Sequence, residues 1–235
     1  MAELEKLIGP RPPEELLAQE RLRFLLPTVF LGLAVFCLLV SIFFPYWRIT
    51  LLAPQYPGGL QAQVYINRVT GDVREIDGLN HYIGMRPLDE AAQLERSLSV
   101  YMVAVLSLLI VAAIYVHNRL AAVLTLPALL YPAIFLADLY YWLRNFGMNL
   151  DPNAPLRNAV KPFVPPLVGE GRVGQFRTVA GLGSGFYLAA LASFLILVGL
   201  YFHRRAYKPL VEGRVEARDG HQADRQASSR VEQVS

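Results

Sequence analysis

The residues best suited to metal chemistry in this chain are one histidine and two methionines. His81 and Met85 lie four residues apart in the stretch "LNHYIGM", and Met148 follows in "FGMNLDP". Imidazole and thioether groups are both ligands for Cu(I), a soft metal ion. On a helix, this spacing would place His81 and Met85 on one face, although Gly84 disfavours a regular helix there. The pattern is therefore open to two interpretations: a Cu(I) site, or methionines that fill apolar gaps beside a hydrogen-bonded histidine.

A second candidate is an acidic residue inside an apolar run. Asp138 lies in the stretch 120–142, and Arg144 follows six residues later. A carboxylate within a membrane-spanning segment is costly without a partner or water, and it often marks an ion or proton pathway. We expect Asp138 to be a structural clamp between a helix and an outer loop, with a proton or ion path as the alternative. Because six residues is not a helical repeat, a residue of another helix could pair with Asp138 instead of Arg144.

The remaining motifs argue against an enzyme and against a nucleic-acid-binding protein. The sequence contains no CxxCH, HExxH, GxSxG or Walker motif, and its net charge of +3 is small. Cys37 is the only cysteine, so no intrachain disulfide can form. His117 and His203 lie at the ends of two apolar runs, and we interpret them as interfacial residues rather than haem ligands.

Membrane-spanning helices are the elements that must position these residues. The chain is 54% apolar and 17% charged, whereas about a quarter of the residues of a soluble domain are charged. A helix needs roughly 20 apolar residues to cross a bilayer. Runs of this length cover residues 24–44, 98–116, 120–142 and 185–202. The first run has no signal-peptidase site after it, so we expect it to remain as an anchor.

The distribution of basic residues predicts the orientation in the membrane. Cytoplasmic flanks of membrane helices are enriched in Lys and Arg, and the strongest such flank follows the fourth run, at Arg204, Arg205, Lys208 and Arg214. We therefore expect segments 1–23 and 203–235 to be cytoplasmic, the latter largely disordered because it lacks apolar periodicity. Segments 45–97 and 143–184 become outer loops of a multi-pass protein of the bacterial inner membrane.

The two outer loops are expected to form one small cap. Apolar residues alternate at Leu60, Ala62, Val64 and Ile66, which predicts a strand. The stretch "RVTGD" would form the turn of a β-hairpin and "VREI" its return strand, while residues 87–97 would form an amphipathic helix. The second loop, rich in Pro and Gly, is expected to pack on the first as an extended segment. The predicted fold class is an all-α membrane protein with four transmembrane helices and an extracytoplasmic cap.

Several stretches of the outer loops resemble a family of small bacterial membrane proteins encoded beside the genes for copper delivery to nitrous oxide reductase. The stretches are "LLAPQYPGGL", "VYIN", "GLNHYIGM", "ADLYYWLRNFGMNLDPNAP" and "PPLVG", within about residues 45–90 and 130–170. The family pattern falls on Pro54, Tyr56, Pro57, Asn80, His81, Gly84, Met85, Asp138, Asp151, Pro152 and Pro155. Relatives often carry His at the position of Met148, an exchange that keeps a soft copper donor.

The resemblance implies a function that is not catalytic. It favours an accessory protein for the maturation of a periplasmic copper enzyme, which would bind or present Cu(I) through His81, Met85 and Met148. The partners would be membrane lipid and a periplasmic copper protein or membrane complex. Three alternatives stay open: a surface that docks a copper protein without binding the metal, a structural subunit of a membrane electron-transfer complex, and a small transporter that uses Asp138.

Overall fold

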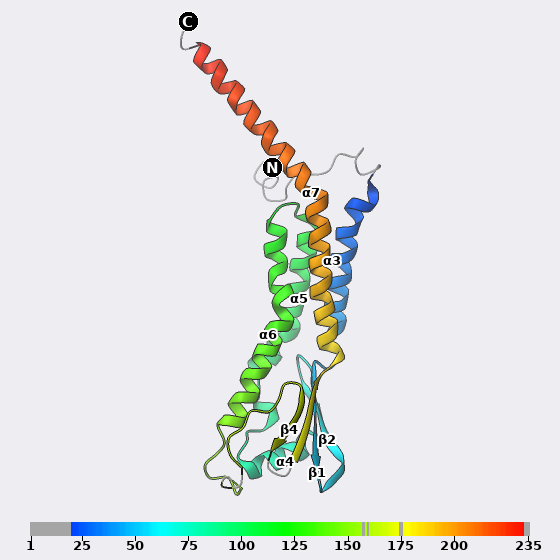
Figure 1. Ribbon diagram of the computed structural model, residues 1–235, viewed down its shortest axis with the longest axis vertical. Coiled ribbons are helices and arrows are strands. Elements are labelled where there is room, and N and C mark those ends of the chain that lie inside the picture. The colour runs from blue at the N-terminus through cyan, green and yellow to red at the C-terminus, as the bar shows by residue number, and fades with distance from the viewer. Residues whose placement is uncertain (1–19, 157, 159, 174–175, 233–235) are drawn as a thin grey trace.

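A bundle of four long helices carries a small β-sheet at one end (Figure 1). The structure is a computed structural model that describes residues 20–156, 158, 160–173 and 176–232. Most of the expected N-terminal segment 1–23 lies outside these residues. The first described helix begins, and the last one leaves the bundle, at the end opposite the sheet.

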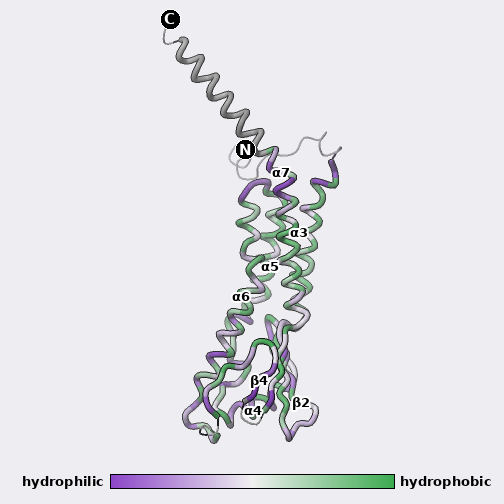
Figure 2. The backbone as a smooth tube through the Cα atoms, viewed as in Figure 1, coloured by the Kyte–Doolittle hydropathy of each residue, from purple (hydrophilic) through white to green (hydrophobic). Residues whose placement is uncertain are grey.

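The four long helices have the length and composition of membrane spans. Figure 2 shows apolar residues along the bundle, with hydrophilic residues gathered at the two ends of the molecule. The helices are α3 (Arg21–Ser41), α5 (Gln93–Tyr115), α6 (Leu120–Met148) and α7 (Ser184–Glu232), of which Ser184–Leu210 is the apolar part. Large apolar side chains such as Phe36 and Leu108 point outward, as expected for surfaces in contact with lipid. These features are consistent with a membrane protein.

Small residues let the helices approach closely. Helix α3 packs on α5 and α7, and α6 packs on α5 and α7, so the four helices close a ring. Ala34, Ala128 and Ala192 are buried at these contacts. A Cβ at Gly199 would lie 2.9 Å from the Leu31 side chain. Because lipid gives no hydrophobic drive for helix association, such close van der Waals packing holds the bundle together.

Two helices are longer than the sequence indicates. Helix α6 has 29 residues and is therefore about 43 Å long at about 1.5 Å per residue, more than the roughly 30 Å of a hydrocarbon core. Its last turns stand beside the sheet as a wall of the cap. The C-terminal segment 203–235 was expected to be largely disordered, but α7 continues through it to Glu232.

The cap contains a five-stranded antiparallel sheet where a single hairpin was expected, so the protein is mostly helical but not all-α. The strand order is β3-β2-β1-β5-β4, which places β1 in the centre between one neighbour from each outer loop. The two loops thus do form one unit, through main-chain pairing rather than side-chain packing alone. The strands are β1 (Trp47–Ala53), β2 (Tyr56–Val64), β3 (Val69–Gly71), β4 (Gly169–Val173) and β5 (Phe176–Leu182).

The predicted hairpin exists, but its return strand is displaced. The alternation in β2 is confirmed by the burial of Leu60 and Ala62, and the partner strand β3 is built from the stretch expected to be the turn. "VREI" instead opens helix α4 (Val73–Ile83), which packs Ile76 against Leu60 and Ala62. The amphipathic helix expected over residues 87–97 is found in part: residues 93–97 begin α5, and a short 3₁₀ turn, η1 (Leu88–Glu90), precedes them.

A tight crossing joins the bundle to the sheet. Tyr46 is completely buried, and its hydroxyl lies 2.7 Å from Ser41 Oγ. The backbone N–H of Gly183 donates to Tyr46 O (2.9 Å), and that of Gly185 donates to Pro45 O (2.9 Å). A Cβ at Gly183 would lie 2.1 Å from Pro45 O. The segment that connects α3 to β1 and the segment that connects β5 to α7 are therefore in direct backbone contact.

Replacing Gly183 by Ala should destabilise the protein by about 1–3 kcal/mol, the usual cost of overpacking, because a backbone carbonyl cannot rotate away like a side chain. Gly181→Ala is the matched control, since a Cβ there meets nothing within 4 Å. The measurement is the thermal unfolding midpoint of the purified variants in detergent. Equal midpoints for the two variants would contradict the proposed steric constraint.

Candidate functional site

The histidine and the methionine of "LNHYIGM" are separated by the end of helix α4. Gly84 caps the helix in the left-handed conformation, with φ +82°. The Met85 N–H donates to Asn80 O (2.9 Å) and the Gly84 N–H to His81 O (3.3 Å), which is the pattern of a glycine-terminated helix. His81 therefore belongs to the last helical turn, whereas Met85 lies beyond it, and the helical spacing that would align them is interrupted.

Two of the segments that carry the sequence resemblance, "GLNHYIGM" and the end of "ADLYYWLRNFGMNLDPNAP", are docked against each other. The Asp151 N–H donates to Gly84 O (2.8 Å), and the Leu156 N–H donates to Tyr82 O (2.9 Å). A Cβ at Gly84 would lie 2.8 Å from Asp151 O and 2.9 Å from the Ala154 Cβ. We call residues 79–85 together with 147–156 the tip unit. It lies at the end of the molecule where α6 terminates, far from the start of α3 (Figure 1).

The tip unit exposes two of the three predicted copper ligands and turns the third inward. His81 is exposed, and its ring contacts Tyr82 at 6.2 Å between centroids. Met148 is 46% exposed at the end of α6. Met85 is half-buried and packs with Ile83, Leu150, Val160 and Phe163. The Cu(I) set of His81, Met85 and Met148 remains a prediction.

An apolar cavity of about 500 Å³ lies between the cap and the bundle. The sheet contributes residues such as Ile49 and Val64, and α4 contributes Leu79. Helices α5 and α6 form the opposite side with residues such as Met102 and Phe135. Met85 also lines this cavity, so its thioether belongs to the interior rather than to the outer surface.

Asp138 lies on the wall of this cavity, beside another acid rather than a base. Its carboxylate on α6 is half-buried and is repelled by Glu95 at the start of α5. The indole N–H of Trp142 lies nearby, one turn further along α6, but outside hydrogen-bonding geometry. Arg144 is exposed, and among the residues that the structure describes it forms no ion pair with Asp138. The clamp and the ion path both stay predictions.

Several polar residues of the cavity are not apparent from the sequence. Asn80 and Thr178 are 7% and 3% exposed, and Glu95 stands at the rim. Only for Trp142 could the sequence have indicated a position near Asp138, because residues four apart on a predicted helix lie on the same face. Thr178 reaches the cavity through the pairing of β1 with β5, which no local pattern predicts.

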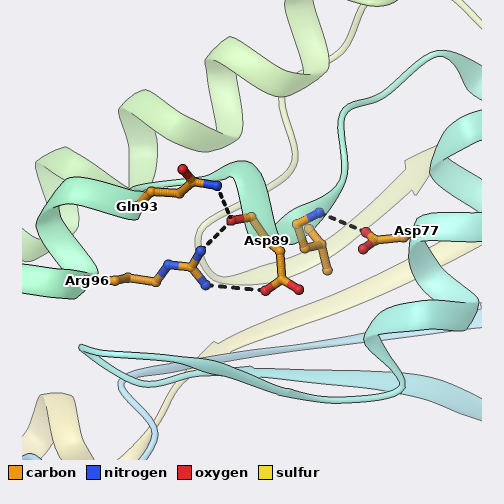
Figure 3. A network of polar contacts seen from close by, with 5 residues as sticks. Asp77, Asp89, Gln93 and Arg96 are labelled. Carbon is orange, nitrogen blue, oxygen red and sulfur yellow. Dashed lines mark hydrogen bonds and ion pairs between the residues drawn. The ribbon is translucent and has the colours of Figure 1, made fainter.

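A polar network holds the segment between α4 and α5 (Figure 3). Asp77 accepts a hydrogen bond from the Leu88 N–H (2.8 Å), and the Arg96 guanidinium contacts the Asp89 carboxylate (3.4 Å) and donates to the Asp89 carbonyl. Gln93 donates to the same carbonyl at 3.3 Å. Burial raises the pKa of the Asp77 carboxyl, the bond from Leu88 opposes this shift, and the negative charge of Asp89 adds to it.

The two histidines of the opposite end form an aromatic cluster. The rings of His117 and His203 are nearly parallel, with centroids 6.1 Å apart, and the Tyr207 ring lies 4.1 Å from His117 and 4.8 Å from His203. His203 is buried. The cluster packs the turn between α5 and α6 against α7.

No protein-family model matches this sequence, and a comparison with curated proteins gives no match.

Asp77→Asn should alter the pH dependence of stability. The folded state holds the Asp77 proton more tightly than the unfolded chain does, so ionisation costs stability at neutral pH, and this cost disappears as the pH falls through the folded pKa. Asn is neutral and still offers an oxygen to the Leu88 N–H. The stability of the variant relative to wild type should therefore be highest near neutral pH and decline with acidification, as measured by thermal midpoints.

The matched control for this prediction is Asp77→Ala. It also removes the charge but leaves the Leu88 N–H without its acceptor, which should cost about 1–3 kcal/mol. A stability difference between Asp77→Asn and wild type that does not change with pH would contradict the prediction.

Proposed function

We propose that this protein is a membrane-anchored accessory factor for the maturation of a periplasmic copper enzyme of the nitrous oxide reductase type, and that it receives or presents Cu(I) at the tip unit. The observation that carries the proposal is the docking of residues 79–85 on 147–156 through backbone hydrogen bonds. Two of the five stretches that suggested the family, "GLNHYIGM" and the end of "ADLYYWLRNFGMNLDPNAP", thus lie together, although some 60 residues separate them in the sequence.

The chemistry of the exposed donors fits a transient copper site. His81 is exposed and, within the described residues, its imidazole makes no hydrogen bond, so its nitrogens are free to bind a metal. Met148 offers a thioether that needs no deprotonation. Imidazole and thioether donors favour Cu(I) over harder ions. An exposed site is suited to a metal that must pass to another protein, and a periplasmic copper protein is the expected partner.

The alternative role of the tip unit is to dock a copper protein without holding the metal. Its rigid backbone and exposed side chains serve either role. In both, the four helices keep the unit at a fixed height above the membrane, because α6 continues without interruption from the bundle to Met148.

Replacing His81 by Ala should weaken Cu(I) binding by about tenfold or more, because even the supporting partners of metal ligands are worth about 10–100-fold in affinity. Met148→Leu should also weaken binding, whereas Met148→His should preserve it, since thioether and imidazole groups are both copper ligands. The measurement is a competition titration of the purified protein against a Cu(I) chelator.

Met102→Leu provides the matched control for this titration. Met102 is also exposed, at 55%, but it lies on α5 in the bundle. Removing its thioether should leave the copper affinity unchanged. Equal affinity in wild type, His81→Ala and Met148→Leu would eliminate the metal site and favour the docking surface.

The proposal requires the cap to face the periplasm. Arg119 and Arg204 lie at the end of the bundle opposite the cap, and basic residues mark the cytoplasmic side. In a Cys37→Ser background, Gln61→Cys and Lys161→Cys should react with a membrane-impermeant thiol reagent in intact spheroplasts. Arg119→Cys and Arg204→Cys should react only after lysis. All four positions are exposed, so the reverse pattern would invert the orientation.

A further inference from the structure

We propose that the cavity between the sheet and helices α5 and α6 binds a lipid-soluble quinone, which is an uncharged ring with two carbonyl oxygens and an apolar tail. Its volume of about 500 Å³ falls within the roughly 300–1,000 Å³ of small-molecule sites. The inference does not depend on copper binding, because it concerns the interior of the cap rather than the exposed donors of the tip unit.

The cavity is placed for entry from the bilayer. Met102 on α5 and Ile134 on α6 line it, and both are also exposed, at 55% and 56%, on the apolar surface of the bundle. A ligand dissolved in the hydrocarbon layer can therefore reach the cavity between these helices without crossing water. The other walls belong to the cap, so the far end of the ligand would lie under the sheet.

The walls suit a flat ring. Aromatic side chains line the cavity on the side of α6 and of the second outer loop, and they include Phe135, Trp142, Phe146 and Phe163. Aromatic pairs favour offset-stacked or edge-to-face contacts, which add about 0.5–1.5 kcal/mol beyond the burial of area. A quinone ring offers such contacts, whereas a saturated acyl chain does not.

Some buried polar atoms of the wall residues lack hydrogen bonds within the described part of the chain. They include Thr178 Oγ1 and Arg96 Nε. Asn80 and Trp142 also line the cavity, but each has a carboxylate beside it, that of Asp77 and that of Asp138. An unsatisfied buried group costs about 1–3 kcal/mol. The Thr178 hydroxyl and the Arg96 Nε–H can both donate, so an acceptor such as a carbonyl oxygen suits them.

The charges at the cavity favour an uncharged head group. Asp138 and Glu95 both line it, while Arg96 is held by Asp89. A phospholipid phosphate would be repelled by the two carboxylates. A lipophilic cation would be attracted, but it would leave the buried donors without an acceptor. A quinone satisfies the donors, and the hydroxyl groups of its reduced form could donate to the carboxylates.

Tryptophan fluorescence provides a direct test, because the two tryptophans of the chain, Trp47 and Trp142, both line the cavity. The purified full-length protein in detergent is titrated with decylubiquinone, which quenches indole fluorescence on contact. We expect saturable quenching in the wild type. Ser99→Phe fills the cavity and should weaken binding about tenfold. Ser97→Phe is the matched control and should bind as the wild type does.

The two serines are closely matched. Each lies on α5 and donates to the carbonyl three residues earlier, but only Ser99 lines the cavity. Thr178→Val preserves shape and removes one donor, so it should weaken binding by about threefold to tenfold, and it carries the test if Ser99→Phe does not fold. Linear quenching of equal slope in all variants would overturn the proposal. Stoichiometric phospholipid that is retained on purification and displaces the quinone would overturn it as well.

Discussion

The structure depends on the crossing where the chain passes twice between the membrane helices and the sheet. The Gly183 N–H donates to Tyr46 O there, and the absence of a side chain at Gly183 allows the two backbone segments to touch. Tyr46 is fully buried, so its hydroxyl must be satisfied inside the protein, and Ser41 at the end of α3 provides the partner. The central strand of the cap is thereby fixed to two of the four helices.

This constraint explains why the cap is one body although it is made of two distant loops. Because α3 leads directly into β1 and β5 directly into α7, the crossing places β1 and β5 side by side, and their pairing joins the loops. Trp47 adds a second link, since its indole N–H donates to Leu167 O (2.6 Å), 120 residues away in the chain. The long helix α6 then stands opposite the sheet, and the apolar cavity lies between them.

In the tip unit, the sequence correctly indicated the effect of Gly84 on the helix but not the direction of the Met85 side chain. The sequence suggests that Gly84 disfavours a regular helix, and in the structure Gly84 ends α4. The same glycine turns Met85 toward Leu150 and Phe163, so the inward direction of this thioether depends on a partner segment. A helical pattern in Ile76, Leu79 and Ile83 could have predicted α4, because these residues recur at intervals of three and four.

The sequence by itself determined the four long apolar helices and the alternating strand β2. These features follow from where side chains are stable, in lipid, in water or at a sheet surface, and that preference is local. Only the tertiary structure decided the pairing of β1 with β5, the approach of Glu95 to Asp138 and the docking of residues 79–85 on 147–156. Backbone hydrogen bonds form between main-chain groups whatever the side chains are, so the residue types do not reveal which segments pair. The close contacts of Gly84 with Asp151 and of Gly183 with Pro45 exist only once both segments are in place.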